Sequence, residues 1–424
     1  MKELKKFIPR TEKDDATVYG AVAEIISKVR KEGDAGVSFY NEKFGGLPAK
    51  TFLVPANELD KALKTVSPEL LKAMKLAAKN IEKFARKQLS CIKPLRTDVM
   101  KGVSLGHSVI PVDSVCCYVP GGNHPLFSTA LMLAIPAKVA GVPRICACVP
   151  PMNGSSLPHP ATLAALKIAG VDEVYATGGA QAIAAIAYGT QSIKPVTMIV
   201  GPGNKYVTEA KRQVFGKVGI DFIAGPSEVL VIADSNANPK IIAADLLAQS
   251  EHDTDASGIL VTTSAALAKA VEKEVEIQLK TLNTADIASI SWKNNGRIIL
   301  AKNISEACEI ANEIAPEHLE VDTADPEALK YKLRNFGSLF MGQGSAEVFG
   351  DYDAGTNHTL PTMGAARYTG GVSVFNFLKI CTFQNISPDG VAKIGKAAVT
   401  MAENEGLTAH ANAARIRLTE HTKQ

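Results

Sequence analysis

The amino-acid sequence predicts an α/β fold with two incomplete Rossmann-like units, each built on a mostly parallel sheet, one inserted into the other, with helical arms at both ends. Two observations predict this fold. Runs rich in β-branched residues alternate with helical runs from Ser114 to Asp234, and a second alternation extends from Gly258 to Met341. Strands that alternate with helices of this length form βαβ units, whose strands are parallel. At 424 residues the chain also exceeds what a single hydrophobic core usually supports.

The composition excludes several classes of protein. Hydrophobic residues make up 46% of the chain and charged residues 21%, which is ordinary for a globular protein. A net charge of +3 offers no electrostatic footprint for nucleic acid. The most apolar stretch, 127–142, is interrupted by Pro136 and Lys138, so we expect neither an export signal nor a membrane span. Seven cysteines without a Cys-x-x-Cys pair indicate reduced thiols in a cytoplasmic protein.

The N-terminal part of the chain is expected to form an arm followed by scaffold helices. Residues 1–15 are charged and aperiodic and are interpreted as an arm. Apolar residues at helical spacing from Ala16 to Lys31 predict a helix that stops at Gly33. A longer helical region follows from Ala56 to Arg86, and Ser67 restarts it with a serine cap and a proline at the first helical position.

Each alternation supplies the strands and helices of one unit. In the first, the predicted strands begin at Ser114, Arg144, Glu173 and Val196, and the predicted helices run from Leu126 to Ala140, Ala161 to Ala169, Ala180 to Tyr188 and Lys205 to Phe215. In the second, strands are predicted at Gly225 to Asp234, Gly258 to Thr263, Arg297 to Leu300, Leu319 to Val321 and Gly337 to Met341, with helices ending near His252, Leu279 and Ile314 and another starting at Pro326.

Glycine follows three predicted strands of the first alternation. The segments are Pro120-Gly-Gly, Thr177-Gly-Gly-Ala and Gly201-Pro-Gly-Asn. Glycine between a strand and a helix lets phosphate groups approach the backbone N–H groups of the helix N-terminus. None of the segments is a Gly-x-Gly-x-x-Gly fingerprint, and each alone is also typical of an ordinary tight turn. Three in succession at one sheet edge therefore leave a nucleotide-type ligand and simple turns both open.

The domain boundaries follow from where these patterns change. We expect residues 16–117 and 229–370 to form one discontinuous α/β domain, into which residues 118–228 are inserted as a second domain that binds the nucleotide. The tail, 371–424, has a short apolar run and two helical patterns but too few apolar residues for a core of its own. Such a tail is expected to pack on a partner subunit.

Three polar segments are candidates for a functional site. Gln249 and His252 stand three apart on a predicted helix, where one oxygen and one nitrogen ligand would begin a zinc or manganese site, although such a pair also commonly caps a helix. Glu317 and His318 are adjacent between a helix and a strand, where acid–base residues are often found. The polar loop 350–361 is the third segment, and turns stabilised by Asx hydrogen bonds would also explain it.

Together these segments resemble the histidinol dehydrogenase family over nearly the whole chain. The matching segments are Tyr118-Val-Pro-Gly-Gly, Pro125-Leu-Phe-Ser-Thr-Ala-Leu-Met-Leu, Gly178-Gly-Ala-Gln-Ala-Ile-Ala, Gly201-Pro-Gly-Asn-Lys-Tyr-Val-Thr-Glu-Ala-Lys-Arg, Ala224-Gly-Pro-Ser-Glu-Val-Leu-Val-Ile-Ala-Asp, Gln249-Ser-Glu-His252, Pro316-Glu-His-Leu, Gly350-Asp-Tyr through Asn357-His358, and Leu407-Thr-Ala-His410.

The resemblance implies a zinc- and NAD-dependent enzyme that oxidises histidinol through the aldehyde to histidine, the last steps of histidine biosynthesis. It implies a homodimer with composite active sites, in which the fourth zinc ligand arrives from the tail of the other subunit. The implied zinc ligands are Gln249, His252, Asp351 and His410. The implied substrate contacts are Ser227, His318, His358 and Glu405 together with the zinc ligands, and the implied NAD contacts are Tyr118, Gln181 and Asn204.

The implied acid–base pair, Glu317 and His318, suits this chemistry. Oxidation of an alcohol needs a base for the hydroxyl proton while hydride leaves the carbon, and a neutral imidazole serves near pH 7. Oxidation of the aldehyde needs an activated water, which the neighbouring carboxylate can supply. The metal is expected mainly to hold the substrate's imidazole and amino nitrogen atoms.

Other segments resemble paralogues that oxidise different small alcohols, notably the sulfopropanediol dehydrogenases. They are Leu105-Gly-His-Ser-Val-Ile-Pro-Val, Phe215-Gly-Lys-Val-Gly-Ile-Asp and Leu360-Pro-Thr-Met-Gly-Ala-Ala-Arg-Tyr-Thr-Gly-Gly. An arginine at 367 could bind a sulfonate. We nonetheless predict histidinol as the substrate, and we expect Arg367 to pair with surface or backbone groups outside the pocket. A non-catalytic binding protein remains as the other alternative, although it would require a broken metal set or acid–base pair.

Overall fold

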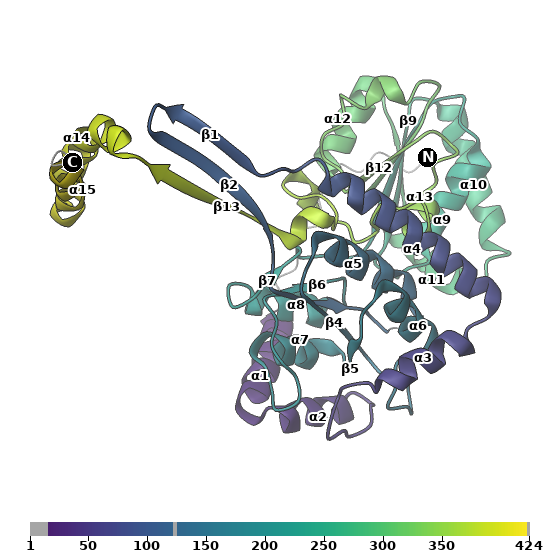
Figure 1. Ribbon diagram of the computed structural model, residues 1–424. Coiled ribbons are helices and arrows are strands. Elements are labelled where there is room, and N and C mark those ends of the chain that lie inside the picture. The colour runs from purple at the N-terminus through teal and green to yellow at the C-terminus, as the bar shows by residue number, and fades with distance from the viewer. Residues whose placement is uncertain (1–15, 122–124, 422–424) are drawn as a thin grey trace.

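The computed structural model describes residues 16–121 and 125–421, which form two α/β units and a projecting arm (Figure 1). The predicted α/β class with two parallel sheets is confirmed. Residues 1–15, where an arm was expected, lie outside the described residues. None of the described helices is long and apolar enough to cross a membrane.

The first unit contains a parallel sheet in the order β5-β4-β3-β6-β7. The strands are β3 (Ser114–Tyr118), β4 (Arg144–Val149), β5 (Glu173–Ala176), β6 (Met198–Val200) and β7 (Gly219–Ile220). From β3 the chain adds β4 and then β5 toward one end of the strand order, and it then returns past β3 to place β6 next to β3 on its other edge. The loops after β3 and β6 therefore diverge, and a crevice at the carboxyl edge between two such strands is where open α/β sheets bind ligands.

Helices cover both faces of this sheet, and two buried clusters of side chains fill the space between. The helices that connect the strands are α5 (Phe127–Ala140), α6 (Pro160–Ala169), α7 (Gly179–Tyr188) and α8 (Lys205–Val214). The N-terminal helices are α1 (Ala16–Glu32), α2 (Asp34–Lys43), α3 (Ala56–Thr65) and α4 (Pro68–Leu89).

The N-terminal helices pack on the first sheet. Helices α3 and α4 share a core with α5 and α6, whereas α1 and α2 share one with α7 and α8. This differs from the expected grouping of residues 16–117 with 229–370. The apolar stripe of a helix shows that it must be buried but does not name the sheet that buries it.

The second unit contains a parallel sheet in the order β10-β9-β8-β11-β12. Its strands are β8 (Glu228–Ala233), β9 (Ser257–Thr262), β10 (Arg297–Leu300), β11 (His318–Asp322) and β12 (Ser338–Met341). Its helices are α9 (Pro239–Ser250), α10 (Ala265–Leu279), α11 (Ala285–Asn295), α12 (Ile304–Ile314) and α13 (Glu347–Tyr352). The helix expected from Pro326 is a single 3₁₀ turn, η1 (Glu327–Leu329).

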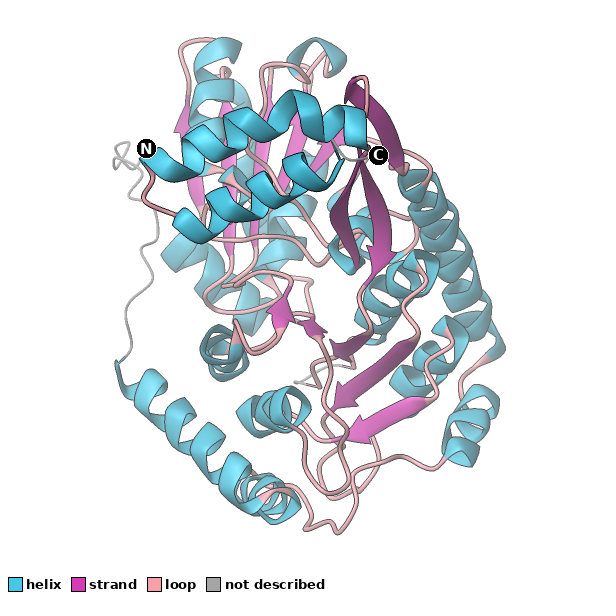
Figure 2. Ribbon diagram, turned by 60° about the vertical axis from the view of Figure 1, so that its left-hand side comes forward, coloured by secondary structure: helices cyan, strands magenta, loops and turns pink. Residues whose placement is uncertain are grey.

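The arm is a three-stranded antiparallel sheet that ends in two helices (Figure 1). Its elements are β1 (Leu95–Met100), β2 (Val103–Pro111), β13 (Leu378–Ile386), α14 (Pro388–Asn404) and α15 (Thr408–His421). The expected strand and two helices of the tail are thus confirmed, whereas the hairpin of β1 and β2 was not anticipated. The two helices pack against each other at the end of the arm (Figure 2).

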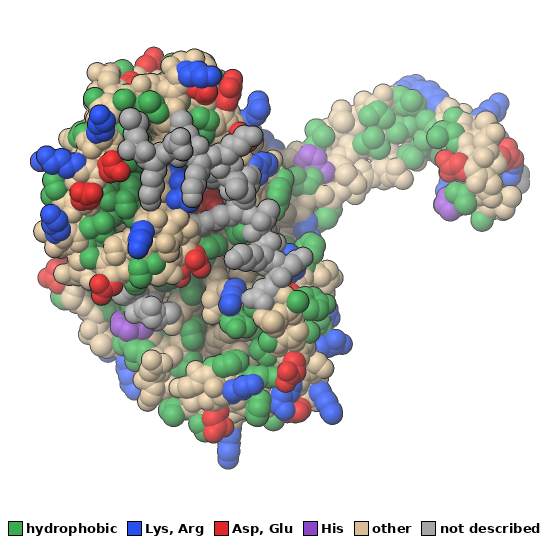
Figure 3. Space-filling model, turned by 180° about the vertical axis from the view of Figure 1, so that it is seen from behind, with side chains coloured by type: hydrophobic (Ala, Val, Ile, Leu, Met, Phe, Trp, Pro, Cys, Tyr) green, Lys and Arg blue, Asp and Glu red, His purple; other side chains and the backbone are tan. Residues whose placement is uncertain are grey.

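The arm exposes apolar side chains far from the two cores. Leu95, Val99 and Ile110 on the hairpin and Ile380 and Phe383 on β13 are all more than two-fifths exposed. Viewed from behind, the arm stands clear of the body and carries hydrophobic side chains along its length (Figure 3). A protein surface of this kind usually meets another chain.

Replacing Leu166 with alanine should lower the free energy of unfolding by about 2–5 kcal/mol, because the side chain lies in the core beneath α6 and its removal leaves a cavity. Leu76→Ala is the matched control. That side chain is 50% exposed on α4, and its loss should change the free energy by no more than about 0.5 kcal/mol. Denaturant unfolding followed by circular dichroism measures both, and equal losses would contradict the described packing.

Candidate active site

Glu317 and His318 lie at the amino end of β11, in the centre of the second sheet. Helix α12 ends at Ile314, and its C-cap Ala315, with a φ of 55°, turns the chain sharply toward the sheet. The turn is held because Ser338 N donates to Glu317 O at 2.9 Å, and His318 then pairs with neighbours on both β8 and β12. Both side chains are buried, at 6% and 4% exposure.

One main-chain residue, Glu228, orients both of these side chains. Its N–H donates to Glu317 Oε2 at 2.9 Å, and its carbonyl oxygen lies 3.1 Å from His318 Nδ1. A carbonyl oxygen only accepts, so His318 Nδ1 carries a proton and Nε2 holds the lone pair of the neutral ring. Within the described part of the chain, Nε2 is buried and has no hydrogen-bond partner. It faces Asp351 Oδ1 at 3.7 Å.

Three acidic or imidazole side chains converge at this point. His318, Glu347 and Asp351 offer ligand atoms that all lie within 4.8 Å of one another. Nitrogen and carboxylate oxygen atoms at this spacing suit a divalent cation of the zinc or manganese kind. Glu347 and Asp351 stand four apart on α13, so the helix presents both on one face.

Gln249 joins the same group from α9. Its side chain is fully buried, and its amide nitrogen lies 3.1 and 3.3 Å from the two Glu347 carboxylate oxygens. The same nitrogen lies 3.1 Å from His318 Nδ1, which donates to Glu228 O, so this second approach is not a hydrogen bond. A carboxylate only accepts, so the amide nitrogen is the atom that faces Glu347. Gln249 and Asp351 thus both approach Glu347 and His318, and their binding of a metal stays a prediction. Glu347 was not among the predicted residues. Its spacing of four residues from Asp351, which places both carboxylates on one face of a helix, could have indicated it.

His252 was expected to share a helical face with Gln249, but it does not. Helix α9 ends at Ser250, so His252 lies beyond its C-cap, and the ring is exposed with Nδ1 3.0 Å from Ala248 O. Its charge still acts on Asp351. His252 therefore stands beside the buried group rather than inside it.

His410 and Glu405 are not brought to this group within one chain. Both are exposed at the end of the arm, Glu405 as the C-cap of α14 and His410 on α15. The arm extends away from the body that carries His318 (Figure 1). The expectation that they serve the site of another subunit remains a prediction.

His358 is held between the two units. Its Nδ1 donates to Asp351 O at 2.9 Å, so its Nε2 accepts from Thr129 Oγ1, 3.1 Å away on α5. Burial lowers the pKa of His358, which keeps the ring neutral. Thr129 lies in the matching segment 125–133 but was not among the predicted site residues, and it is therefore a contact between the first unit and the loop after α13.

Burial and mutual charge shift the protonation of the whole group. Burial raises the pKa of Glu317 and of Glu347, each to about 8. Burial acts against the charge of His318, but the carboxylates of Glu347, Glu317 and Asp351 outweigh it and raise the pKa of that ring. Burial also disfavours the charge of Asp351, and the nearby His318 ring overcomes this and lowers the pKa of Asp351. Such a set of shifted pKa values is typical of a functional site.

The predicted cofactor residues lie at the carboxyl edge of the first sheet. Tyr118 ends β3, and its hydroxyl accepts from Gly179 N at 3.0 Å, at the start of α7. Gln181 follows on α7, where Asn41 Oδ1 accepts from its amide nitrogen at 3.1 Å. Asn204 caps α8 by accepting from the backbone N–H groups of residues 206 and 207. Asn41, which reaches this edge from α2, was not predicted.

The two units touch beside the buried group. The loop 357–362 contacts the first unit, where Asn357 Nδ2 donates to Met132 O at 2.6 Å. Thr362 Oγ1 accepts from Gly225 N at 2.5 Å, two residues before Ser227. Ser227 itself lies in the loop that enters β8, and its carbonyl accepts from Ser257 N at 3.0 Å.

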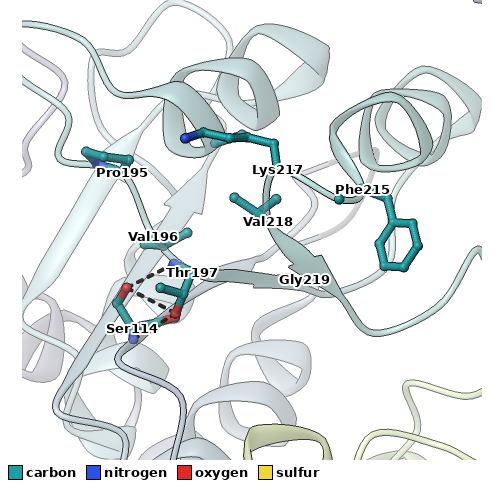
Figure 4. A pocket seen from close by; sticks show the side chains of 10 residues that line it. Ser114, Pro195, Val196, Thr197, Phe215, Lys217, Val218 and Gly219 are labelled. Atoms are coloured by element: carbon teal, nitrogen blue, oxygen red, sulfur yellow. Dashed lines mark hydrogen bonds between the residues drawn. The ribbon is translucent and has the colours of Figure 1, made fainter. Parts of the chain in front are cut away.

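A surface pocket lies at the opposite edge of the first sheet (Figure 4). Ser114, which begins β3, and Thr197, which precedes β6, line it and hydrogen-bond each other: Thr197 N donates to Ser114 Oγ at 3.0 Å. Tyr118 stands at the other end of β3, so this pocket is separate from the candidate active site.

Arg367 binds backbone groups, as predicted. Its guanidinium donates to the carbonyl oxygens of Gly364 and Glu313, the latter in the last turn of α12. The Arg367 side chain therefore hydrogen-bonds a carbonyl group in the last turn of α12 instead of binding a small anion.

Comparison with known proteins agrees with this geometry. The histidinol dehydrogenase family model matches residues 8–418. A histidinol dehydrogenase of Rhizobium meliloti is 48% identical over 98% of this chain and 96% of its own length. One from Methanothermobacter thermautotrophicus is 44% identical over 98% of this chain and 97% of its own.

A solved structure is similar over the same extent. The crystal structure of histidinol dehydrogenase from Elizabethkingia anophelis matches with a TM-score of 0.92 and 39% identity, and the match covers 97% of this chain and 94% of that one. The family match, the full-length relatives and the shared fold lead to one conclusion: the chain belongs to the histidinol dehydrogenase family.

Proposed function

We propose that this protein is a zinc- and NAD-dependent histidinol dehydrogenase that oxidises L-histidinol through the aldehyde to L-histidine in histidine biosynthesis. The observation that carries the proposal is the buried His318, whose unpartnered Nε2 faces Asp351 beside the carboxyl group of Glu317. A base and a water-activating group at one point are what two successive oxidations of one carbon require. The printed names of the relatives support the substrate.

The donor set fits zinc. Asp351 and Glu347 on α13 and the unpartnered Nε2 of His318 belong to one group of ligand atoms, and Gln249 contacts Glu347 from α9. His252 stands beside them, and His410 of a second copy would complete the set. A divalent cation among these carboxylates would hold the nitrogen atoms of the substrate and supply the positive charge that favours a neutral His318.

The edge of the first sheet fits NAD. The loop after β6 begins with Gly201, where a Cβ atom would lie 2.2 Å from Tyr118 O, so the backbone approaches as closely as a nucleotide-binding turn requires. Gln181 is 3% exposed, and its Oε1 atom has no partner among the described residues. NAD bound here would accept the hydride from the substrate carbon.

The residues of the chain then divide the work. His318 Nε2 takes the proton of the substrate hydroxyl in the first oxidation, and the carbonyl of Glu228 holds the ring in the tautomer that permits it. Glu317 takes a proton from a water molecule that attacks the aldehyde in the second. Main-chain bonds to Glu228 keep both groups in place for both steps.

We further propose a homodimer with composite active sites. The arm carries His410 and Glu405 away from the body and exposes apolar residues on both of its outer strands. A second copy would cover that surface and receive the two polar side chains at its own buried group.

The parent enzyme should reduce NAD with L-histidinol, and Arg367→Ala should leave this turnover within a few-fold, because the guanidinium binds only backbone carbonyls among the described residues. The rate of NADH formation with L-histidinol and with 2,3-dihydroxypropane-1-sulfonate measures both. A parent that oxidises only the sulfonate, and loses that activity in Arg367→Ala, would establish the alternative substrate.

Glu317→Gln should slow oxidation of the aldehyde by about 10²-fold or more while slowing oxidation of the alcohol less, because only the second step needs an activated water. His318→Asn should damage the first step directly. Each half-reaction is measured separately, with L-histidinol or L-histidinal as substrate. Equal damage to both half-reactions in both variants would contradict the division of roles.

His410→Ala should lower the zinc content of the purified protein and abolish activity, as His318→Ala should abolish activity with the zinc content largely retained. Mixing the two inactive proteins under conditions of subunit exchange should restore part of the activity, since one of the two sites in a mixed dimer would be intact. Exchange verified by mass spectrometry without any recovery would refute the composite site.

A further inference from the structure

A buried pair of opposite charges holds the loop that follows β6. Lys211 on α8 and Asp221 after β7 form an ion pair, and their side chains are 3% and 0% exposed. The cost of removing two charges from water is large, and well-packed apolar residues often stabilise a fold equally well. A buried pair at this position therefore calls for a role other than stability alone.

Both members of the pair bind the same residue. Lys211 Nζ donates to Gly201 O at 2.8 Å, and Asp221 Oδ2 accepts from Gly201 N at 2.7 Å. The two peptide groups that flank Gly201 are thus fixed, one by a cation and the other by an anion. Hydrogen bonds to charged groups are the strong ones, so this point of the backbone has little freedom to rotate.

The backbone at Gly201 has a conformation that only glycine tolerates. Its φ is 121°, and a Cβ atom would lie 2.2 Å from the carbonyl oxygen of Tyr118. The loop and the end of β3 therefore touch through bare backbone. Whatever fixes Gly201 also fixes the distance between Tyr118 and the residues that follow in the loop.

Those following residues lead directly into α8. The loop 201–204 ends at Asn204, the cap of α8, and Lys211 stands seven residues further on the same helix face. A second tie, Thr208 Oγ1, lies 3.3 Å from Gly203 O and 3.2 Å from Ala224 O. Two side chains of α8, Lys211 and Thr208, thus hydrogen-bond carbonyl groups of the loop that precedes the helix.

We infer that Lys211 and Asp221 are positioning residues for the cofactor: they hold the loop 201–204 against Tyr118 in the shape that receives the dinucleotide. This inference rests on the proposed function, because it presumes that NAD binds at this edge. Neither residue needs to touch the cofactor. Their effect is to maintain a binding surface made of backbone and of Asn204, so that binding does not have to order the loop first.

Lys211→Met should weaken NAD binding by about ten-fold or more, since the charge-assisted bond that fixes Gly201 is lost. Isothermal titration calorimetry of NAD into the purified dehydrogenase measures the Kd. The zinc content and the KM for L-histidinol should stay within a few-fold of the parent, so that KM for NAD changes selectively.

Arg144→Met is the matched control. Arg144 forms an ion pair with Glu173 in the same sheet, with Nε 2.9 Å from Glu173 Oε2, but at the amino edge, away from the loop. Its loss should reduce thermal stability and leave the Kd for NAD unchanged. A purely structural role for Lys211 would make the two variants behave alike.

A second variant keeps the test decisive if Lys211→Met does not fold. Lys211→Met combined with Asp221→Asn leaves no unpaired buried charge, and the asparagine oxygen still accepts from Gly201 N. This protein should fold and bind NAD more weakly than the parent. NAD binding equal to the parent in either variant would overturn the inference alone, whereas a parent that binds no NAD would overturn the proposed function and the inference with it.

Discussion

The arrangement of the candidate site depends on the two main-chain bonds that Glu228 makes. Its N–H group and its carbonyl oxygen, both at the start of β8, fix the carboxyl group of Glu317 and the imidazole of His318. Main-chain atoms in a central strand cannot move without disturbing the neighbouring strands, so both side chains inherit the rigidity of the sheet. The tautomer of His318, and therefore the direction of its free lone pair, follows from this one contact.

The second constraint is the burial of several charges in a small volume. Glu317, Glu347 and Asp351 surround His318 with little access to water, and carboxylates placed so closely cannot all be ionised without a compensating charge. A protein that needed only stability would not retain this cluster. The cluster makes sense as a preformed receptor for a cation and a polar substrate, and the contact of Thr129 with His358 joins it to the first unit.

Much of the fold could be predicted from the sequence, because helices and strands have characteristic local periodicities of apolar residues. The alternation from Ser114 onward identified the first sheet, and the position of Glu317 and His318 between a helix and a strand was correct. Contacts between segments far apart in the sequence produce no such local pattern. Asn41 and Thr129 resemble any polar residue on a helix, and the packing of residues 16–89 on the first sheet depends on shapes that appear only in three dimensions. The hairpin of β1 and β2 escaped notice because β1 is exposed along its whole length and shows no buried face.

The pairing of β13 with β2 has a consequence for how the chain folds. Nine residues of β13 pair with the whole of β2, from Leu378 opposite Pro111 to Ile386 opposite Val103, yet both sheets of the body lie between them in the sequence. During synthesis on the ribosome the hairpin must therefore wait with one edge unpaired until almost the entire chain has emerged. An unpaired edge with exposed apolar residues favours association with other chains, so the arm is open to aggregation until β13 has been made.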